Sequence, residues 1–186
     1  MLENFLTLPY LIIYAALYGT TMKIADLFNE HGMKSWFKGS NIIFGILWGI
    51  FGGLLILSNI YVANVLLAMI VAFIFRMRID YKNHAIATVI IVTTFLLRSE
   101  VEPLIFLLFL ANFIIFGSAK DYFDDVLKSE GILKKISESG WYYVIPTFIY
   151  GFFTNQWIVF YVFTTYIIFY DIVKYSLELK LRNKLS

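Results

Sequence analysis

Three acidic residues lie within five positions at the end of a long apolar run. Asp121, Asp124 and Asp125 occupy the stretch from Lys120 to Lys128. Asp121 and Asp125 are four residues apart, so they share a face if the stretch is helical. Mg²⁺ commonly takes one or two protein carboxylates and completes its coordination with water and phosphate oxygens. The spacing is therefore typical of a Mg²⁺ site for a diphosphate, and the alternative is a solvated helix end whose acids pair with Lys120 and Lys128.

A second acidic pair of the same spacing follows the first apolar run. Asp26 and Glu30 are four residues apart, and they share a face if the helix continues beyond the apolar run. The same two interpretations apply, because these carboxylates could bind a metal or pair with Lys23. The candidate metal ligands of the whole chain are therefore Asp26, Glu30, Asp121, Asp124 and Asp125.

A basic connection between two apolar runs carries Arg76, Arg78 and Lys82. Arginine can grip phosphate oxygens with a bidentate fork, and lysine adds a point charge. We therefore expect an anion site here, with anchoring to lipid headgroups as the alternative. His84, at the end of this connection, is expected to be an interfacial residue and not a metal ligand.

The composition identifies the medium in which these groups work. Hydrophobic residues make up 60% of the 186 residues and aromatic residues 19%, and the mean hydropathy is +0.77. Such a chain lacks the polar residues that cover a soluble domain, so we expect an integral membrane protein. The net charge of +2 does not indicate nucleic-acid binding. The absence of cysteine excludes disulfides, thiol catalysis and cysteine-ligated metals.

We expect an all-α multi-pass protein with about seven transmembrane helices in one bundle. The expected spans are 4–21, 40–58, 60–76, 84–98, 102–118, 140–154 and 156–174, compared with the ~20 apolar residues that a crossing helix needs. Most lysines and arginines fall in the connections 22–38, 76–84 and 119–139 and in the C-terminal tail. The positive-inside rule then places the N-terminus outside and the C-terminus and acidic connections in the cytoplasm. We expect the plasma membrane of a prokaryote as the location.

Polar and small residues inside the expected spans predict how the helices pack. Asn64 and Asn112 are expected to form hydrogen bonds between helices. Four glycines in the second span let it approach a neighbour closely: Gly45, Gly49, Gly52 and Gly53.

An internal repeat relates the two acidic connections. A shift of 98 positions aligns Gly19 with Gly117 and Asp26 with Asp124. Chance alignment of apolar chains does not supply matches at glycines and charged residues. We therefore predict parallel half-repeats at roughly 4–83 and 102–181, linked by a fourth span at roughly 84–98 within a single domain, 1–186. Both acidic connections then open on one face of the membrane.

This arrangement resembles the UbiA-type intramembrane prenyltransferase superfamily. Residues 22–30 stand against its first motif, N-D-x-x-D-x-x-x-D, and residues 121–125 against its second, D-x-x-x-D. The second motif retains both acids. The first retains Asp26 and an acid at Glu30, but Met22 and Lys23 replace its leading Asn-Asp pair, so a cation stands where the family has a metal ligand.

The resemblance implies a helical bundle around a lipid-facing cavity, in which Mg²⁺ bridges the acids to a polyprenyl diphosphate. The prenyl group would pass to an acceptor as the diphosphate leaves. Asp121, Asp125 and Asp26 would be catalytic. The substrate would be bound by Arg76, Arg78, Lys82, Lys23 and Lys120.

Two other classes of function stay open from the residues alone. A noncatalytic membrane scaffold or lipid-binding subunit needs the fold and tolerates incomplete motifs. A small transporter or channel needs charges inside the spans, and the spans hold almost none. The expected ligand is a membrane lipid or a polyprenyl diphosphate, and a membrane-protein partner or a homo-oligomer is compatible with the sequence.

Overall fold

The structure is a computed structural model that describes residues 7–29, 33–127 and 140–185. These residues form α-helices, one π-helical turn and connections, with no β-strand among them. The helices are α1 (Leu8–Asn29), α2 (Ser40–Ser58), α3 (Ile60–Phe75), α4 (Lys82–Arg98), α5 (Pro103–Asp121), α7 (Trp141–Thr154) and α8 (Trp157–Leu185), with the π-helical turn η2 (Tyr122–Val126) after α5.

Local sequence signals explain where several helices begin. The Asn59 side chain caps α3, because its Oδ1 accepts from the backbone N–H groups of Tyr61 and Val62. Pro103 opens α5 in the first turn, where its missing N–H costs nothing. Gly39 and Gly140 precede α2 and α7 in the left-handed conformation, at φ 88° and 65°, which glycine adopts without strain.

The seven expected segments correspond to the seven α-helices of the described residues, so the all-helical class is confirmed. α1 and α8 continue further than expected, to Asn29 and Leu185. Within the described part of the chain, four helices are long and apolar enough to cross a membrane: α1, α2, α5 and the Trp157–Leu177 part of α8. α3 is apolar but shorter. These helices support a membrane protein, and the number of crossings stays a prediction.

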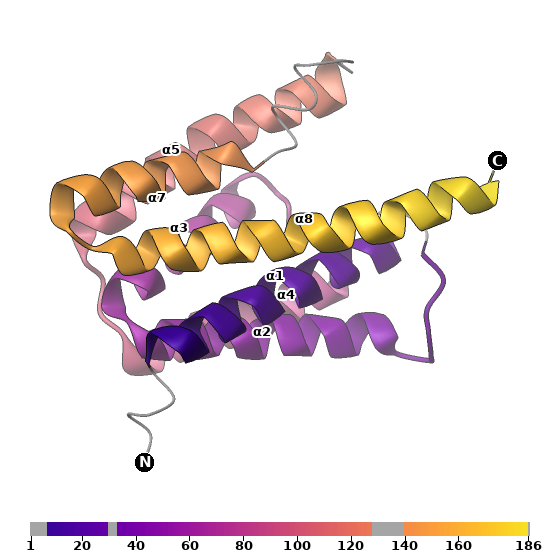
Figure 1. The fold of residues 1–186 in the computed structure, drawn as a ribbon, viewed down its shortest axis with the longest axis horizontal. Helices are drawn as coiled ribbons and strands as arrows, with labels where there is room; N and C mark the ends of the chain where they lie inside the picture. Colours follow the sequence, from indigo (N-terminus) through magenta and orange to yellow (C-terminus); the bar gives the residue numbers. More distant parts are fainter. Residues whose placement is uncertain (1–6, 30–32, 128–139, 186) are drawn as a thin grey trace.

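Consecutive helices run in alternating directions across the bundle (Figure 1). α1 packs against α2 and α8, α2 packs against α4, α3 against α5, and α7 against α8. The two half-repeats would make α1 equivalent to α5 and α3 equivalent to α8. The α1–α8 and α3–α5 pairs are then equivalent contacts, although the duplication itself stays a prediction.

Glycine allows the closest helix contacts. A Cβ at Gly45 would stand 2.7 Å from Asn83 Cβ, and one at Gly49 would stand 2.8 Å from Ile90 Cδ1, so α2 meets α4 through its glycines. This confirms the close approach predicted for the second span. Between α1 and α8 the contact is tighter still, since a Cβ at Gly19 would lie 2.2 Å from the carbonyl oxygen of Tyr166.

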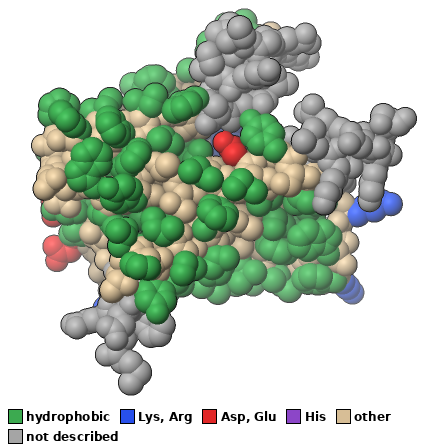
Figure 2. All heavy atoms as spheres, viewed as in Figure 1, with side chains coloured by type: hydrophobic (Ala, Val, Ile, Leu, Met, Phe, Trp, Pro, Cys, Tyr) green, Lys and Arg blue, Asp and Glu red, His purple; other side chains and the backbone are tan. Residues whose placement is uncertain are grey.

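The outer surface is apolar over much of its area. Figure 2 shows hydrophobic side chains over most of the described part of one face, with few charged groups among them. Leu104 on α5 is 83% exposed and Phe153 on α7 is 80% exposed. Contiguous apolar surface of this kind is costly in water and favourable in lipid.

Candidate functional site

Two arginines from the α3–α4 connection enclose the carboxylate of Asp121 at the end of α5. Arg76 contacts Oδ2 through both Nε, at 2.8 Å, and Nη2, at 2.7 Å. Arg78 contacts Oδ1 through Nη2 at 2.6 Å. Both carboxylate oxygens therefore accept charge-assisted hydrogen bonds. The Arg76 side chain is 7% exposed, that of Asp121 19% and that of Arg78 41%.

The backbone at the end of α3 explains why both arginines reach one carboxylate. Arg76 caps the helix, and Met77 adopts a left-handed conformation at φ 55°. The Arg78 N–H then returns to the carbonyl of Phe73 at 2.9 Å. This tight turn resembles helix ends in which a left-handed residue directs late N–H groups to carbonyls of the last turn. It leaves Met77 exposed and places the arginines on either side of it.

Gly117 supplies the space for Arg76. A Cβ at this glycine would stand 2.1 Å from Arg76 Nη1 and 2.4 Å from Cζ. The guanidinium therefore lies directly against the α5 backbone, one helical turn before Asp121. Nη1 is buried and has no hydrogen-bond partner among the described residues.

A second cluster surrounds Asp26 on α1. His84 Nε2, at the start of α4, lies 3.1 Å from Asp26 Oδ1, and the Tyr170 hydroxyl on α8 donates to Oδ2 at 3.0 Å. Asp26 and His84 are each 6% exposed. The neighbouring Asn83 side chain fixes the start of α4 on α1, because its Nδ2 donates to the carbonyl of Ala25 at 3.0 Å.

His84 also connects the Asp26 cluster to the arginines. Its Nδ1 lies 3.3 Å from the carbonyl oxygen of Arg78 and 3.4 Å from Oδ1 of Asp80. Oxygen acceptors therefore face both ring nitrogens, and only the doubly protonated ring donates on both sides. The result is one polar network that runs from Asp26 through His84 to Arg78 and Asp121. We call these four residues, with Arg76, the polar end of the bundle.

The other predicted cations surround the polar end to different extents. Lys23 is 2% exposed, and its Nζ lies 5.2 Å from the centre of the Tyr170 ring. Lys82 is exposed at the first turn of α4, and Lys120 is half-buried one residue before Asp121.

The structure therefore brings many of the predicted site residues to one end of the bundle. Asp26 and Asp121 do not touch, but the α3–α4 connection links them. Glu30 and the side chains of Asp124 and Asp125 lie outside the described part of the chain. Sequence reasoning missed His84 and Tyr170 as partners of Asp26. His84 was expected at the membrane interface, which stays a prediction, but its burial against Asp26 was not foreseen. No sequence signal pointed to Tyr170.

The described carboxylates do not fit Mg²⁺ in this arrangement. Both oxygens of Asp121 contact guanidinium groups, and both oxygens of Asp26 contact His84 or Tyr170. Among the described residues, no three or more histidine or acidic side chains are grouped as a metal site requires. A Mg²⁺ ion at Asp121 would lie beside two guanidinium groups, whose positive charge repels it.

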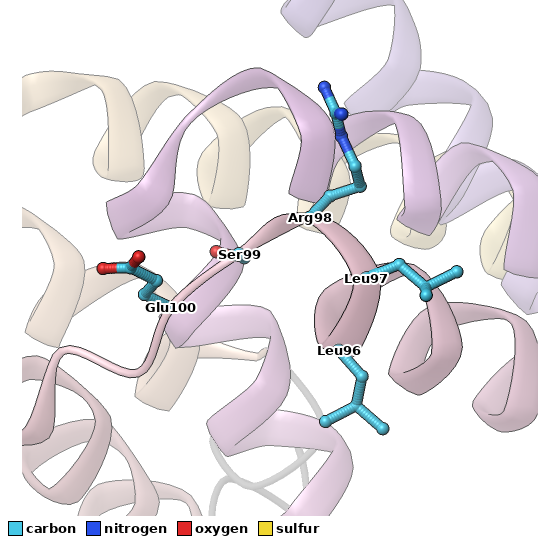
Figure 3. A pocket seen from close by; sticks show the side chains of 5 residues that line it. All are labelled: Leu96, Leu97, Arg98, Ser99 and Glu100. Atoms are coloured by element: carbon cyan, nitrogen blue, oxygen red, sulfur yellow. The ribbon is translucent and has the colours of Figure 1, made fainter.

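Another candidate site lies at the opposite end of α4 and is less convincing. A shallow cavity of about 290 Å³ is lined by the consecutive residues Leu96, Leu97, Arg98, Ser99 and Glu100. Figure 3 shows that the long side chains of this segment point in different directions. A ligand site needs polar groups that converge, so the polar end is the stronger candidate.

The fold and the polar end together define a class: an all-helical, membrane-type bundle with an ionic network at one end. Comparison with family models, with curated proteins and with solved structures found no match. The function must therefore be inferred from the geometry of the site.

Proposed function

We propose that the polar end binds the diphosphate of a polyprenyl diphosphate and that the protein transfers the prenyl group to an acceptor. The observation that carries this proposal is the position of Arg78. The Arg78 side chain is 41% exposed and contacts Asp121, and the exposed Lys82 begins the next helix. A phosphate group at the membrane surface could approach both cations.

The physical setting suits a lipid with an anionic head. Arginine binds phosphate oxygens through two parallel N–H groups, and the apolar helices offer a medium for an isoprenoid chain. In the transfer, the bond between the prenyl carbon and the diphosphate oxygen breaks, and its electron pair leaves with the diphosphate. The acceptor then forms a bond to the prenyl carbon and loses a proton. Fixed cations stabilise the negative charge that develops on the leaving oxygen.

A second candidate is a noncatalytic lipid-binding subunit, which one observation favours. The carboxylates of Asp26 and Asp121 are both satisfied by internal partners. Such pairing suits a structural role as well as a binding role. Turnover separates the two candidates, because a subunit binds the lipid and releases no diphosphate.

We also propose an orientation, in which the polar end faces the cytoplasm of a prokaryotic cell. Support comes from the cationic residues at this end, among them Lys23, Arg76, Arg78, Lys82 and Lys120. The segment of residues 98–102 would then face outward.

The test is binding of farnesyl diphosphate to the purified full chain in nanodiscs, with farnesol as the control ligand. We expect saturable binding of the diphosphate and none of farnesol at equal concentration. Release of diphosphate in the presence of candidate acceptors then tests transfer. Equal binding of the two ligands would contradict a diphosphate site.

A further inference from the structure

We infer that this site binds its anion with the protein's own cations, and that Asp121 positions Arg78 and Arg76 and does not bind Mg²⁺. The inference rests on the proposed function. It departs from the metal chemistry that the acidic spacing predicts, and it gives Asp121 a different role.

The first step is the charge balance around Asp121. One carboxylate lies between two guanidinium groups, at 2.6 Å from Arg78 and 2.7 Å from Arg76. Each oxygen of this carboxylate therefore has a guanidinium group beside it. A divalent cation at Asp121 would be repelled by both guanidinium groups, and partial burial strengthens the repulsion.

The second step is that Arg76 has little room to move away. Its guanidinium rests on Gly117, with Nη1 buried, and contacts Asp121 Oδ2 through two nitrogens. A Mg²⁺ ion bound to Oδ2 at its usual ~2.1 Å would approach this guanidinium closely. If Arg76 moved away from Asp121, a buried cation would be left without its counter-ion, which is unfavourable.

The third step concerns Lys23, which lies three residues before Asp26 on α1. Its side chain is 2% exposed, and its ammonium lies over the ring of Tyr170, whose hydroxyl donates to Asp26. A cation therefore belongs to the Asp26 cluster as well. In both acidic connections, cationic side chains therefore lie close to the carboxylate: Arg76 and Arg78 at Asp121, and Lys23 in the Asp26 cluster.

The remaining step is access. Arg76 is buried and acts through the network, whereas Arg78 is 41% exposed and can contact an anion. Asp121 fixes the direction of the Arg78 guanidinium. Losing this carboxylate leaves the charge of Arg78 in place but removes one of the contacts that orient its guanidinium, which weakens a bidentate contact.

The experiment measures farnesyl diphosphate binding to the full chain in nanodiscs of zwitterionic lipid, once with excess EDTA and once with Mg²⁺. We expect dissociation constants in the two conditions to agree within about twofold, because no metal ion completes the site. Asp121→Asn is expected to weaken binding about tenfold in both conditions. Asp121→Glu should recover part of the loss, because it restores a carboxylate, which a change in overall stability alone would not explain.

The outcomes separate this inference from the proposed function. Binding that requires Mg²⁺ would overturn the inference and leave the proposed function intact. Absence of binding in both conditions would overturn the two together. The wild-type comparison with EDTA and Mg²⁺ decides the matter even if Asp121→Asn does not fold.

Discussion

The guanidinium of Arg76 lies directly on Gly117, so that a Cβ at this glycine would stand 2.1 Å from Nη1. This contact joins the end of α3 to the last turns of α5. It also holds Arg76 in the position from which it pairs with Asp121. A glycine at the contact is therefore part of the ionic cluster, although it carries no functional group.

Gly117→Ala is expected to destabilise the protein by about 1–3 kcal/mol, because the guanidinium must leave its contact with Asp121. Thermal unfolding in detergent measures the effect. Gly53→Ala is the matched control, since its Cβ would meet Thr94 Oγ1 at 3.1 Å and leave the ion pair intact. Both variants gain the same helix propensity. A Gly117→Ala protein as stable as the Gly53→Ala protein would contradict the role given to this contact.

Tyr170→Phe removes one hydrogen bond to Asp26 and is expected to lower the free energy of unfolding by about 1 kcal/mol. The Tyr170 hydroxyl joins α8 to α1 at the polar end. Tyr175→Phe is the control, because Tyr175 lies on the same helix and is 57% exposed. We expect the losses in the free energy of unfolding to be non-additive when Tyr170→Phe, Asp26→Asn and the double variant are compared, because the two residues are in direct contact. Additive losses would argue against the hydrogen bond.

Asn64 should matter more for stability than Asn112. The Asn64 side chain donates to the carbonyls of Ile60 and Glu100 and accepts from the Glu102 N–H. Asn112 donates to the carbonyl of Tyr142 on α7. Asn64 thus ties α3 to the α4–α5 connection, and Asn112 forms the helix contact that its sequence position predicts.

Asn64→Leu is therefore expected to lower the free energy of unfolding by about 1–3 kcal/mol. This loss is larger than that of Asn112→Leu, because Asn64→Leu leaves more backbone groups without partners. Thermal unfolding of the two variants side by side provides the measurement. The interpretation fails if Asn112→Leu proves to be the more damaging change.

The proposed orientation can be measured without background, because the chain contains no cysteine. Ser35→Cys and Glu100→Cys place single thiols at exposed sites, one before α2 and one between α4 and α5. In intact bacterial cells, we expect a membrane-impermeant maleimide to label the Glu100→Cys protein and not the Ser35→Cys protein. The Ser35→Cys protein should react after the membrane is permeabilised. Labelling in the reverse order would invert the orientation.

The helices could be predicted because long apolar runs alternate with polar or charged connections. In the structure, these helices begin beside Asn59, Pro103 and Gly140. The alternation of basic connections with short ones predicts that the residues of the polar end lie on one side of the membrane. The structure brings them to one end of the bundle, and the side of the membrane stays a prediction.

The partners of these residues could not be predicted, and the reason is physical. Helices that are apolar on all sides carry no stripe that shows which face meets which neighbour. His84 is 58 residues from Asp26 and Tyr170 is 144 residues away. Those contacts depend on how the helices are rotated and packed. For the same reason, Arg76 and Arg78 were expected to face a ligand, and their pairing with Asp121 was not foreseen.

The central claim is that an anionic lipid head binds at Arg78, and a pair of variants tests it most directly. Arg78→Gln and Arg98→Gln each remove one exposed arginine, the first in the α3–α4 connection and the second at the last residue of α4. Farnesyl diphosphate binding is measured for both in nanodiscs with EDTA. We predict that Arg78→Gln weakens binding about tenfold, whereas Arg98→Gln binds as the wild type does. Equal affinity in the two variants, or a loss confined to Arg98→Gln, would contradict the account.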